Sequence, residues 1–269
     1  MSHCVHLASD LHLGAEAAMT SVDRERGFVR WMRNAARGEG FAEGRQATEI
    51  HLVGDIFDFW FEYKRAVPKG GVRLMGAIAE LSDSGLPIHF HTGNHDLWTF
   101  GYLTQELGVR VHRTPIVETW DGLTCMVGHG DGLGPKDQRY KRLKRMFTSK
   151  TCQSAFRLIH PDLGIALAQS WSNRSRNTGE NPLSSDMNEE HLYAYAMDWL
   201  ETHDDNIDAF IFGHRHLPID VSLVGYNARY INTGDWLTHL SSVVIQHGRA
   251  ELLNHCLLYT SDAADDDHC

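Results

Sequence analysis

The sequence of 269 residues lacks the features typical of an integral membrane protein, a secreted protein or a nucleic-acid binder. It has no run of about 18 apolar residues, so no transmembrane helix is expected. The amino terminus has neither the basic region nor the long apolar stretch of a secretory signal. The five cysteines are scattered and form no C-x-x-C pair, which favours reduced thiols in a cytosolic protein. The formal net charge of -10 argues against nucleic acid as a general partner.

The remaining composition is that of an ordinary globular chain, with 42% hydrophobic and 22% charged residues. Five short apolar runs predict strands, at residues 4–8, 50–53, 87–91, 124–127 and 209–212. Residues 23–36 and 72–82 have the charge content and apolar spacing of helices. Strands that alternate with helices predict an α/β fold in which helices are layered over a sheet.

Residues 136–190 interrupt this alternation, because they contain no clear strand. We expect them to form a helical cap inserted into a core made of residues 1–135 and 191–255. Between Lys136 and Arg176 the segment has ten basic residues and only two acidic ones, interleaved with apolar residues at helical spacing. Such a helix either lies on an anionic bilayer and shelters acyl chains or simply packs on the core. Residues 256–269 resemble translated vector sequence, with a disordered acidic tail as the alternative, and carry no functional argument.

Each predicted strand runs into a polar cluster. The clusters are Asp10-Leu11-His12, Gly54-Asp55-Ile56-Phe57-Asp58, Gly93-Asn94-His95-Asp96, Gly128-His129-Gly130-Asp131 and Gly213-His214-Arg215-His216. Ligand sites of α/β sheets form beyond the carboxyl ends of strands, so these clusters are expected to converge. Carboxylate, amide and imidazole groups suit Mn, Zn or Fe, and the absence of cysteine disfavours a structural zinc site. Four of the clusters have a glycine before a ligand, which is expected to let the backbone turn sharply, namely Gly54, Gly93, Gly128 and Gly213.

Each motif taken alone has a simpler explanation, such as a turn or a helix cap. The five together, in order and each after a strand, predict a metal site. Other histidines are interpreted as structural or surface residues, namely His51, His89, His91, His112, His160 and His203. The aromatic residues after Asp55 are interpreted as core rather than as a substrate pocket, namely Phe57, Phe59, Trp60 and Phe61.

The order of the five motifs resembles the calcineurin-like metallophosphoesterase superfamily over nearly all of residues 4–245. The resemblance implies a sandwich of two mixed sheets flanked by helices. Within the superfamily, four segments are similar to the UDP-2,3-diacylglucosamine hydrolases of lipid A biosynthesis, at residues 9–14, 54–60, 128–134 and 213–218. Many of those hydrolases carry Arg where this chain has His95, which is the commoner residue of the superfamily.

The resemblance also implies a ligand scheme for two divalent ions, with Mn as the first choice and Zn or Fe as alternatives. Asp10, His12 and His216 would hold one ion, Asn94, His129 and His214 the other, and Asp55 would bridge them. His95 would lie near the leaving group, with Asp96 orienting its imidazole. Asn94, Asp137 and His214 would contact the substrate.

The implied reaction is attack of water on the α-phosphorus of UDP-2,3-diacylglucosamine, which yields UMP and 2,3-diacylglucosamine 1-phosphate. The implied partners are this diacylated lipid and an anionic membrane surface, on the cytoplasmic face of the inner membrane. One alternative keeps the metals but takes a soluble phosphodiester, nucleotide or phosphoprotein. Another is a non-catalytic scaffold, which the complete ligand set disfavours. The sequence gives no indication of the oligomeric state.

Overall fold

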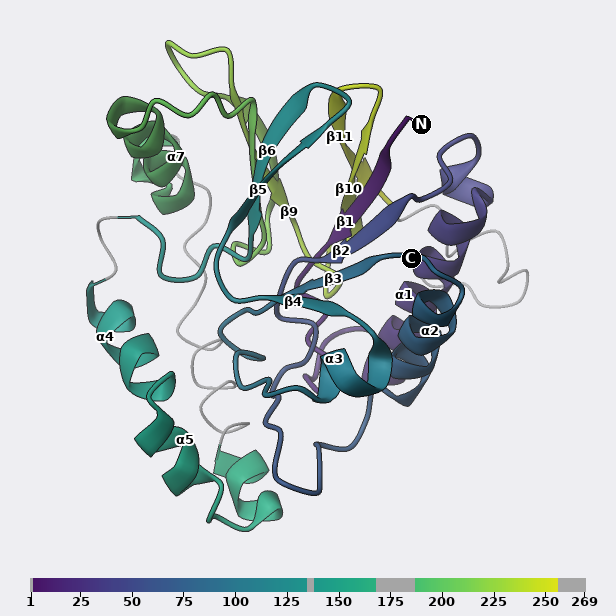
Figure 1. Cartoon of the computed structure of the whole chain (residues 1–269), viewed down its shortest axis with the longest axis vertical. Coiled ribbons are helices and arrows are strands. Elements are labelled where there is room, and N and C mark those ends of the chain that lie inside the picture. Colours follow the sequence, from purple (N-terminus) through teal and green to yellow (C-terminus); the bar gives the residue numbers. More distant parts are fainter. Residues whose placement is uncertain (1, 135–137, 168–186, 256–269) are drawn as a thin grey trace.

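The computed structural model describes residues 2–134, 138–167 and 187–255, and its strands form two sheets (Figure 1). The six-stranded sheet has the order β11-β10-β1-β2-β3-β4, with β1 to β4 parallel and β10 and β11 antiparallel. Its strands are β1 (Cys4–Ala8), β2 (Glu49–Leu52), β3 (Ile88–His91), β4 (Arg110–His112), β10 (Ser241–Gln246) and β11 (Arg249–Asn254).

The second sheet has five strands in the order β5-β6-β7-β9-β8, of which β6, β7 and β9 are parallel. These strands are β5 (Ile116–Trp120), β6 (Leu123–Gly128), β7 (Ala209–Phe212), β8 (Pro218–Ser222) and β9 (Arg229–Thr233). All five strands expected from the sequence are therefore present, and the two mixed sheets confirm the α/β sandwich.

The helices are distributed over the outer faces of the sheets and one side of the molecule (Figure 1). They are α1 (Ser21–Arg37), α2 (Val72–Asp83), α3 (Tyr102–Leu107), α4 (Gln138–Phe147), α5 (Lys150–Phe156) and α7 (His191–Thr202), with short 3-10 turns at η1 (Gly40–Ala42) and η2 (Met187–Glu189). Residues 161–167 are also helical. No helix of the described ranges is long and apolar enough to cross a membrane.

Side chains along each strand alternate between the two faces of its sheet, and the buried apolar residues form three clusters. In β2 and β3, Ile50 and Phe90 point toward α1 and α2, where they join the largest apolar cluster. On β1, Val5 and Leu7 point the other way and pack between the two sheets. Helix α7 covers the outer face of the second sheet with Leu192 and its neighbours. The order of layers is therefore helix, sheet, sheet, helix.

This arrangement brings five loops to one edge of the sandwich. Strands β1, β2 and β3 run parallel in one sheet, and β6 and β7 run parallel in the other. Their carboxyl ends carry the five polar clusters. Backbone hydrogen bonds tie the loops together, from the amide of Asp10 to the carbonyl of Gly54 (3.0 Å) and from Gly213 to His129 (3.0 Å).

Helices α4 and α5 lie outside the two sheets and form one side of the molecule (Figure 1). Phe156 packs against Phe61 and Trp98, with ring centroids 4.8 and 4.7 Å apart, and Trp98 Nε1 donates a hydrogen bond to the carbonyl of Phe147 (2.8 Å). Phe57, Trp60 and Phe61 are buried, as their interpretation as core residues expected, whereas Phe59 is half-buried and its ring lies beside Trp98 and Phe156. Division of the chain into core and cap remains a prediction, because residues 135–137 and 168–186 lie outside the described ranges.

Candidate metal centre

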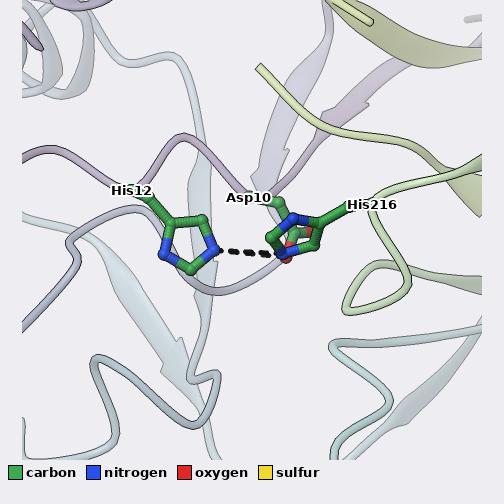
Figure 2. Close-up of side chains that lie close together, drawn as sticks. All are labelled: Asp10, His12 and His216. Carbon is green, nitrogen blue, oxygen red and sulfur yellow. Dashed lines mark hydrogen bonds and ion pairs between the residues drawn. The ribbon is translucent and has the colours of Figure 1, made fainter. Parts of the chain in front are cut away.

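The first group of potential ligands comes from the loops after β1 and β7. Asp10, His12 and His216 each offer a ligand atom, and these atoms lie within 4.8 Å of one another (Figure 2). Nε2 of His216 is 3.1 Å from Oδ1 of Asp10 and 3.2 Å from Nε2 of His12. Ligand bonds of about 2.0–2.2 Å place neighbouring donors about 3–3.5 Å apart, so this spacing suits one divalent ion.

The second group comes from the loops after β3, β6 and β7. Nε2 of His129 lies 3.3 Å from Oδ1 of Asn94, and the ligand atoms of Asp55, His129 and His214 lie within 4.8 Å of one another. Nδ1 of His129 is 2.9 Å from the carbonyl oxygen of Val53. A carbonyl only accepts, so Nδ1 carries the proton and Nε2 presents its lone pair to an ion.

Asp55 lies between the two groups. Its Oδ2 is 3.2 Å from Nε2 of His129 in the second group and 3.7 Å from Nε2 of His12 in the first. Oδ1 accepts a hydrogen bond from the amide of His95 (2.9 Å), which fixes the carboxylate. The structure thus brings together all seven residues expected as ligands, and Asp55 is placed where a bridging ligand must lie.

The buried polar atoms of the site fit a cation. Oδ1 of Asp10 is buried 3.1 Å from Nε2 of His216, and a buried carboxylate requires such a counter-charge or a bound cation. Burial alone would raise the pKa of Asp10, but the neighbouring His216 and His12 lower it, so the group is a carboxylate at neutral pH. Burial would likewise lower the pKa of His129, yet the Asp55 carboxylate raises it to about 10. His129 must therefore release a proton when it binds a metal.

Five of the ligands have left-handed backbone conformations. The φ angles are 54° at Asp10, 44° at His12, 52° at Asp55, 71° at His214 and 53° at His216. Non-glycine residues adopt this region infrequently, and such outliers are concentrated at functional sites. The loops are therefore shaped to aim these side chains rather than to continue the strands.

The glycines before the ligands act in two different ways. Gly54 has a φ of 86° and also faces His129, because a Cβ there would lie 2.5 Å from the Nδ1 atom. Gly213 has no positive φ, but the chain turns sharply after it, as expected, because the amide of Arg215 donates a hydrogen bond to the carbonyl of Gly213 (2.8 Å). A Cβ at Gly213 would lie 2.6 Å from Oδ2 of Asp10, so its role is to leave space for that carboxylate.

His95 borders the site, but its expected partner is wrong. Nδ1 of His95 is 2.8 Å from the carbonyl oxygen of Asp58 and 3.7 Å from the Asp58 carboxylate. The carboxylate of Asp96 instead accepts hydrogen bonds from the amides of Gly93 (2.7 Å) and Ile56 (2.8 Å). Consecutive side chains diverge from the backbone, which is why Asp96 turns away from its neighbour. Asp96 positions the loops, and Asp58 orients the imidazole.

Asp58 and Asp131 are functional residues to which the motif analysis assigned no role, although both stand in the motifs. Asp58 also lies 3.4 Å from Nδ1 of His12, so it supports two histidines of the site. Asp131 forms an ion pair with Lys144 (2.7 Å) and accepts a hydrogen bond from Tyr140 (2.6 Å), both on α4. This contact attaches α4 beside His129. Asp137, expected to touch the substrate, lies outside the described residues.

The fold and the site define a metallophosphoesterase of the calcineurin-like class: a two-sheet sandwich with two adjoining groups of Asp, Asn and His ligands. No family model matches the chain. Among curated proteins, UDP-2,3-diacylglucosamine hydrolase of Porphyromonas gingivalis is 33% identical over 253 residues, covering 89% of this chain and 93% of the relative. The enzyme of the same name from Aeromonas hydrophila is 28% identical over 252 residues, covering 93% and 98%. The chain therefore belongs to the UDP-2,3-diacylglucosamine hydrolase family.

Two solved structures show distant similarity to the chain. A phosphoesterase of E. coli, Yfce, aligns with a TM-score of 0.42 at 14% identity, covering 90% of this chain and 87% of that structure. A zinc complex of Vps29 from Entamoeba histolytica aligns with a TM-score of 0.37 at 12% identity, covering 93% and 98%. The family assignment rests on the sequence relatives.

Proposed function

We propose that this protein hydrolyses the diphosphate bond of UDP-2,3-diacylglucosamine, releasing UMP and 2,3-diacylglucosamine 1-phosphate. The observation that carries the proposal is Asp55, whose carboxylate lies 3.7 Å from His12 in one ligand group and 3.2 Å from His129 in the other. That placement fits a dinuclear centre for phosphoryl chemistry. Membership of the hydrolase family supports the choice of substrate.

Asp10, His12 and His216 would hold one divalent ion and Asn94, His129 and His214 the other, with Asp55 between them; bound ions, with Mn the first choice, would activate water and offset charge on the phosphate oxygens. The protein holds them from five loops, of which the Asp10 and Asp55 loops are joined by backbone hydrogen bonds. Its carboxylates are ionised, because the surrounding histidines lower the pKa of Asp10 and Asp55 even though burial would raise both. No side chain needs to act as a nucleophile.

We assign His95 the role of a neutral hydrogen-bond acceptor. Burial lowers its pKa, and two cations beside it would lower that pKa further, so the ring is neutral near pH 7. Its proton lies on Nδ1, which donates to the carbonyl of Asp58, and Nε2 then carries the lone pair. The leaving group is a phosphate monoester whose second pKa is about 6, so it departs without needing a proton at neutral pH.

The cap carries an apolar and basic surface that suits a lipid substrate. Five of its large apolar side chains are exposed, at Leu143, Met146, Leu158, Leu163 and Leu167. Residues 140–167 contain six Lys or Arg and a single acidic residue, Asp162. We propose that this face contacts the acyl chains and the anionic membrane surface on the cytoplasmic side, where each nearby basic residue contributes about 1 kcal/mol.

The test compares two substrates and two sets of variants. One protein combines Arg142→Glu and Arg145→Glu with Leu143→Ser and Met146→Ser, all on exposed positions of α4. Phe147 is left unchanged because its ring packs on Trp98. Purified protein with Mn is assayed on UDP-2,3-diacylglucosamine in anionic liposomes and on a soluble aryl phosphodiester.

Wild type should hydrolyse the lipid substrate, and the α4 variant should lose that activity and liposome binding while retaining the soluble diester activity. The control replaces Val72 and Val224, which are 70% and 76% exposed and lie off the cap, with Ser. The control should behave as wild type. Wild-type protein that hydrolyses only the soluble diester would refute the substrate, whereas an unaffected α4 variant would refute the lipid-binding cap alone.

A further inference from the structure

A second concentration of histidines lies away from the dinuclear centre. Glu49, His51 and His89 each offer a ligand atom, and these atoms lie within 4.8 Å of one another. With the adjoining His91 and His112 they form what we call the histidine cluster. It belongs to β2, β3 and β4, and Glu49 stands at the start of β2, whereas Asp55 follows the end of that strand.

Strand register explains why these side chains meet. In the parallel pairing of β2 and β3, His51 is the partner of His89, and in the pairing of β3 and β4, His91 is the partner of His112. The intervening Ile50, Leu52 and Phe90 face the helices. The histidines therefore occupy the inter-sheet side, which β1 fills with Val5 and Leu7. Imidazoles stand here where the neighbouring strand has aliphatic residues.

The spacing within the cluster is that of ligands around one ion. Oε2 of Glu49 lies 3.4 Å from Nε2 of His51 and 3.4 Å from Nε2 of His89. These separations exceed the usual range of about 2.7–3.2 Å for a hydrogen bond with nitrogen. Bonds of about 2.0–2.2 Å at tetrahedral angles give a donor separation of about 3.3–3.5 Å. The contact of His51 with Glu49 is thus a long hydrogen bond, and both distances also match the spacing of donors around one ion.

Each of the three side chains also has a polar partner for its other nitrogen or oxygen atom, as metal ligands usually have. Nδ1 of His51 lies 3.1 Å from Nε2 of His91, and Nδ1 of His89 lies 2.9 Å from Nε2 of His112. Trp120 on β5 donates a hydrogen bond to the other oxygen of Glu49 (2.6 Å). Oε2 of Glu49 lies beside both Nε2 atoms, but the rings of His51 and His89 are stacked with centroids 4.2 Å apart, so one ring must turn for both lone pairs to reach the same ion.

One of the three inner atoms has no hydrogen-bond partner among the described residues. Nε2 of His89 is buried and makes no hydrogen bond to any residue of the described ranges, although His89 is only 6% exposed. A buried polar nitrogen without a partner is costly. Burial also lowers the pKa of His89 to about 3, which keeps its ring in the neutral form that ligates metals.

We propose that Glu49, His51 and His89 bind a divalent transition-metal ion of the Zn²⁺ type, at a site separate from the dinuclear centre. One carboxylate and two imidazoles are donors that Zn²⁺ accepts, and the partial exposure of Glu49 leaves room for water as a fourth ligand. The ion joins β2 to β3 and, through the Glu49 contact with Trp120, joins the first sheet to the second. Its role is to stabilise the sandwich, not to take part in hydrolysis.

The experiment counts bound metal. Full-length protein is stripped with a chelator, loaded with Zn²⁺, freed of excess ion and analysed by elemental mass spectrometry. Glu49→Gln and His89→Gln should each retain one ion per chain fewer than wild type, while Mn-supported hydrolysis persists. His203→Gln is the matched control, because His203 is an exposed histidine stacked on Trp199, and it should bind as wild type does.

A further variant, in which the histidine cluster is unchanged, tests the proposal even if a cluster variant folds poorly. Asp55→Asn combined with His216→Asn disables the dinuclear centre and leaves the cluster intact. This protein should still bind one Zn²⁺ per chain and should melt at a higher temperature with Zn²⁺ than without it, because ligand binding to the native state stabilises it. Equal zinc content in wild type and both cluster variants, or no zinc in the disabled background, would overturn the proposal.

Discussion

Replacement of Gly93 by Ala tests how tightly the bridging carboxylate is held. A Cβ at this position would overlap Oδ1 of Asp55 and would lie 2.7 Å from the Asp55 amide nitrogen and 2.8 Å from its Cγ. Ordinary contacts begin near 3.4 Å, so the Asp55 backbone must move by about 0.7 Å and its carboxylate by about 1 Å. Gly93 has no positive φ, so the backbone itself tolerates alanine and the effect is one of space alone.

Displacement of a catalytic group by about 1 Å costs about 10²-fold in rate. We therefore expect Gly93→Ala to lower kcat/KM by at least that factor and to reduce the number of bound ions. The control is Gly76→Ala in α2, where a Cβ meets nothing within 4 Å and alanine should stabilise the helix by about 0.5–1 kcal/mol. Metal analysis, kinetics and thermal melting of both variants decide the matter. Wild-type turnover and metal content in Gly93→Ala would refute the placement of Asp55 as the bridge.

Three further predictions follow from the same structure. Asp55→Ala should lose activity and bound metal more completely than Asp10→Ala, because the Asp55 carboxylate lies beside the ligand nitrogens of both groups; equal losses in metal analysis would contradict the bridge. His95→Ala should lower kcat about 10²-fold without loss of metal. Since burial lowers the His95 pKa, the ratio of wild-type to variant rates should stay constant between pH 7 and 8, and a steep fall would show that the charged ring is needed. Burial lowers the pKa of His255 to about 4, against 6.5 when unfolded, so its contribution to stability is present above pH 6.5 and is lost as pH falls toward 4. Urea unfolding at pH 7 and pH 5 should therefore show about 2 kcal/mol less pH dependence in His255→Asn than in wild type.

The strands that carry the ligands were predictable because they are buried on both faces. Every residue of the short strands β1, β3 and β7 is buried, and each strand is followed by a polar cluster; β7 is apolar throughout, whereas β1 contains one histidine and β3 two. Parallel strands buried on both sides read as continuous apolar segments, and the sequence marks their ends clearly. The convergence of the metal ligands followed from that pattern and the order of the motifs.

The strands that the sequence did not reveal lie mostly at sheet edges or pair with edge strands. Strand β4 has only three residues, of which Arg110 is exposed, and β5 exposes Val117, Glu118 and Thr119. Such strands are stabilised by pairing with a neighbour more than by their own apolar pattern. The register between strands could not be predicted from the sequence either. His51 and His89 were therefore interpreted as separate histidines, and their proximity becomes evident only from the pairing of β2 with β3.

The left-handed conformations of the ligands link the chemistry of the site to its folding. Five non-glycine residues at positive φ, each costing about 1 kcal/mol or more, require on the order of 5 kcal/mol, which is comparable with the whole stability of a domain. Hydrogen bonds such as that from the His12 amide to the Asp55 carbonyl (3.0 Å) offset part of this cost, and bound ions would offset more. Asp and His are among the residues that tolerate this conformation best, and they are also metal ligands. The same residue types thus satisfy the turn and the ion, so that each motif combines a strand end, a tight turn and a ligand within a few residues.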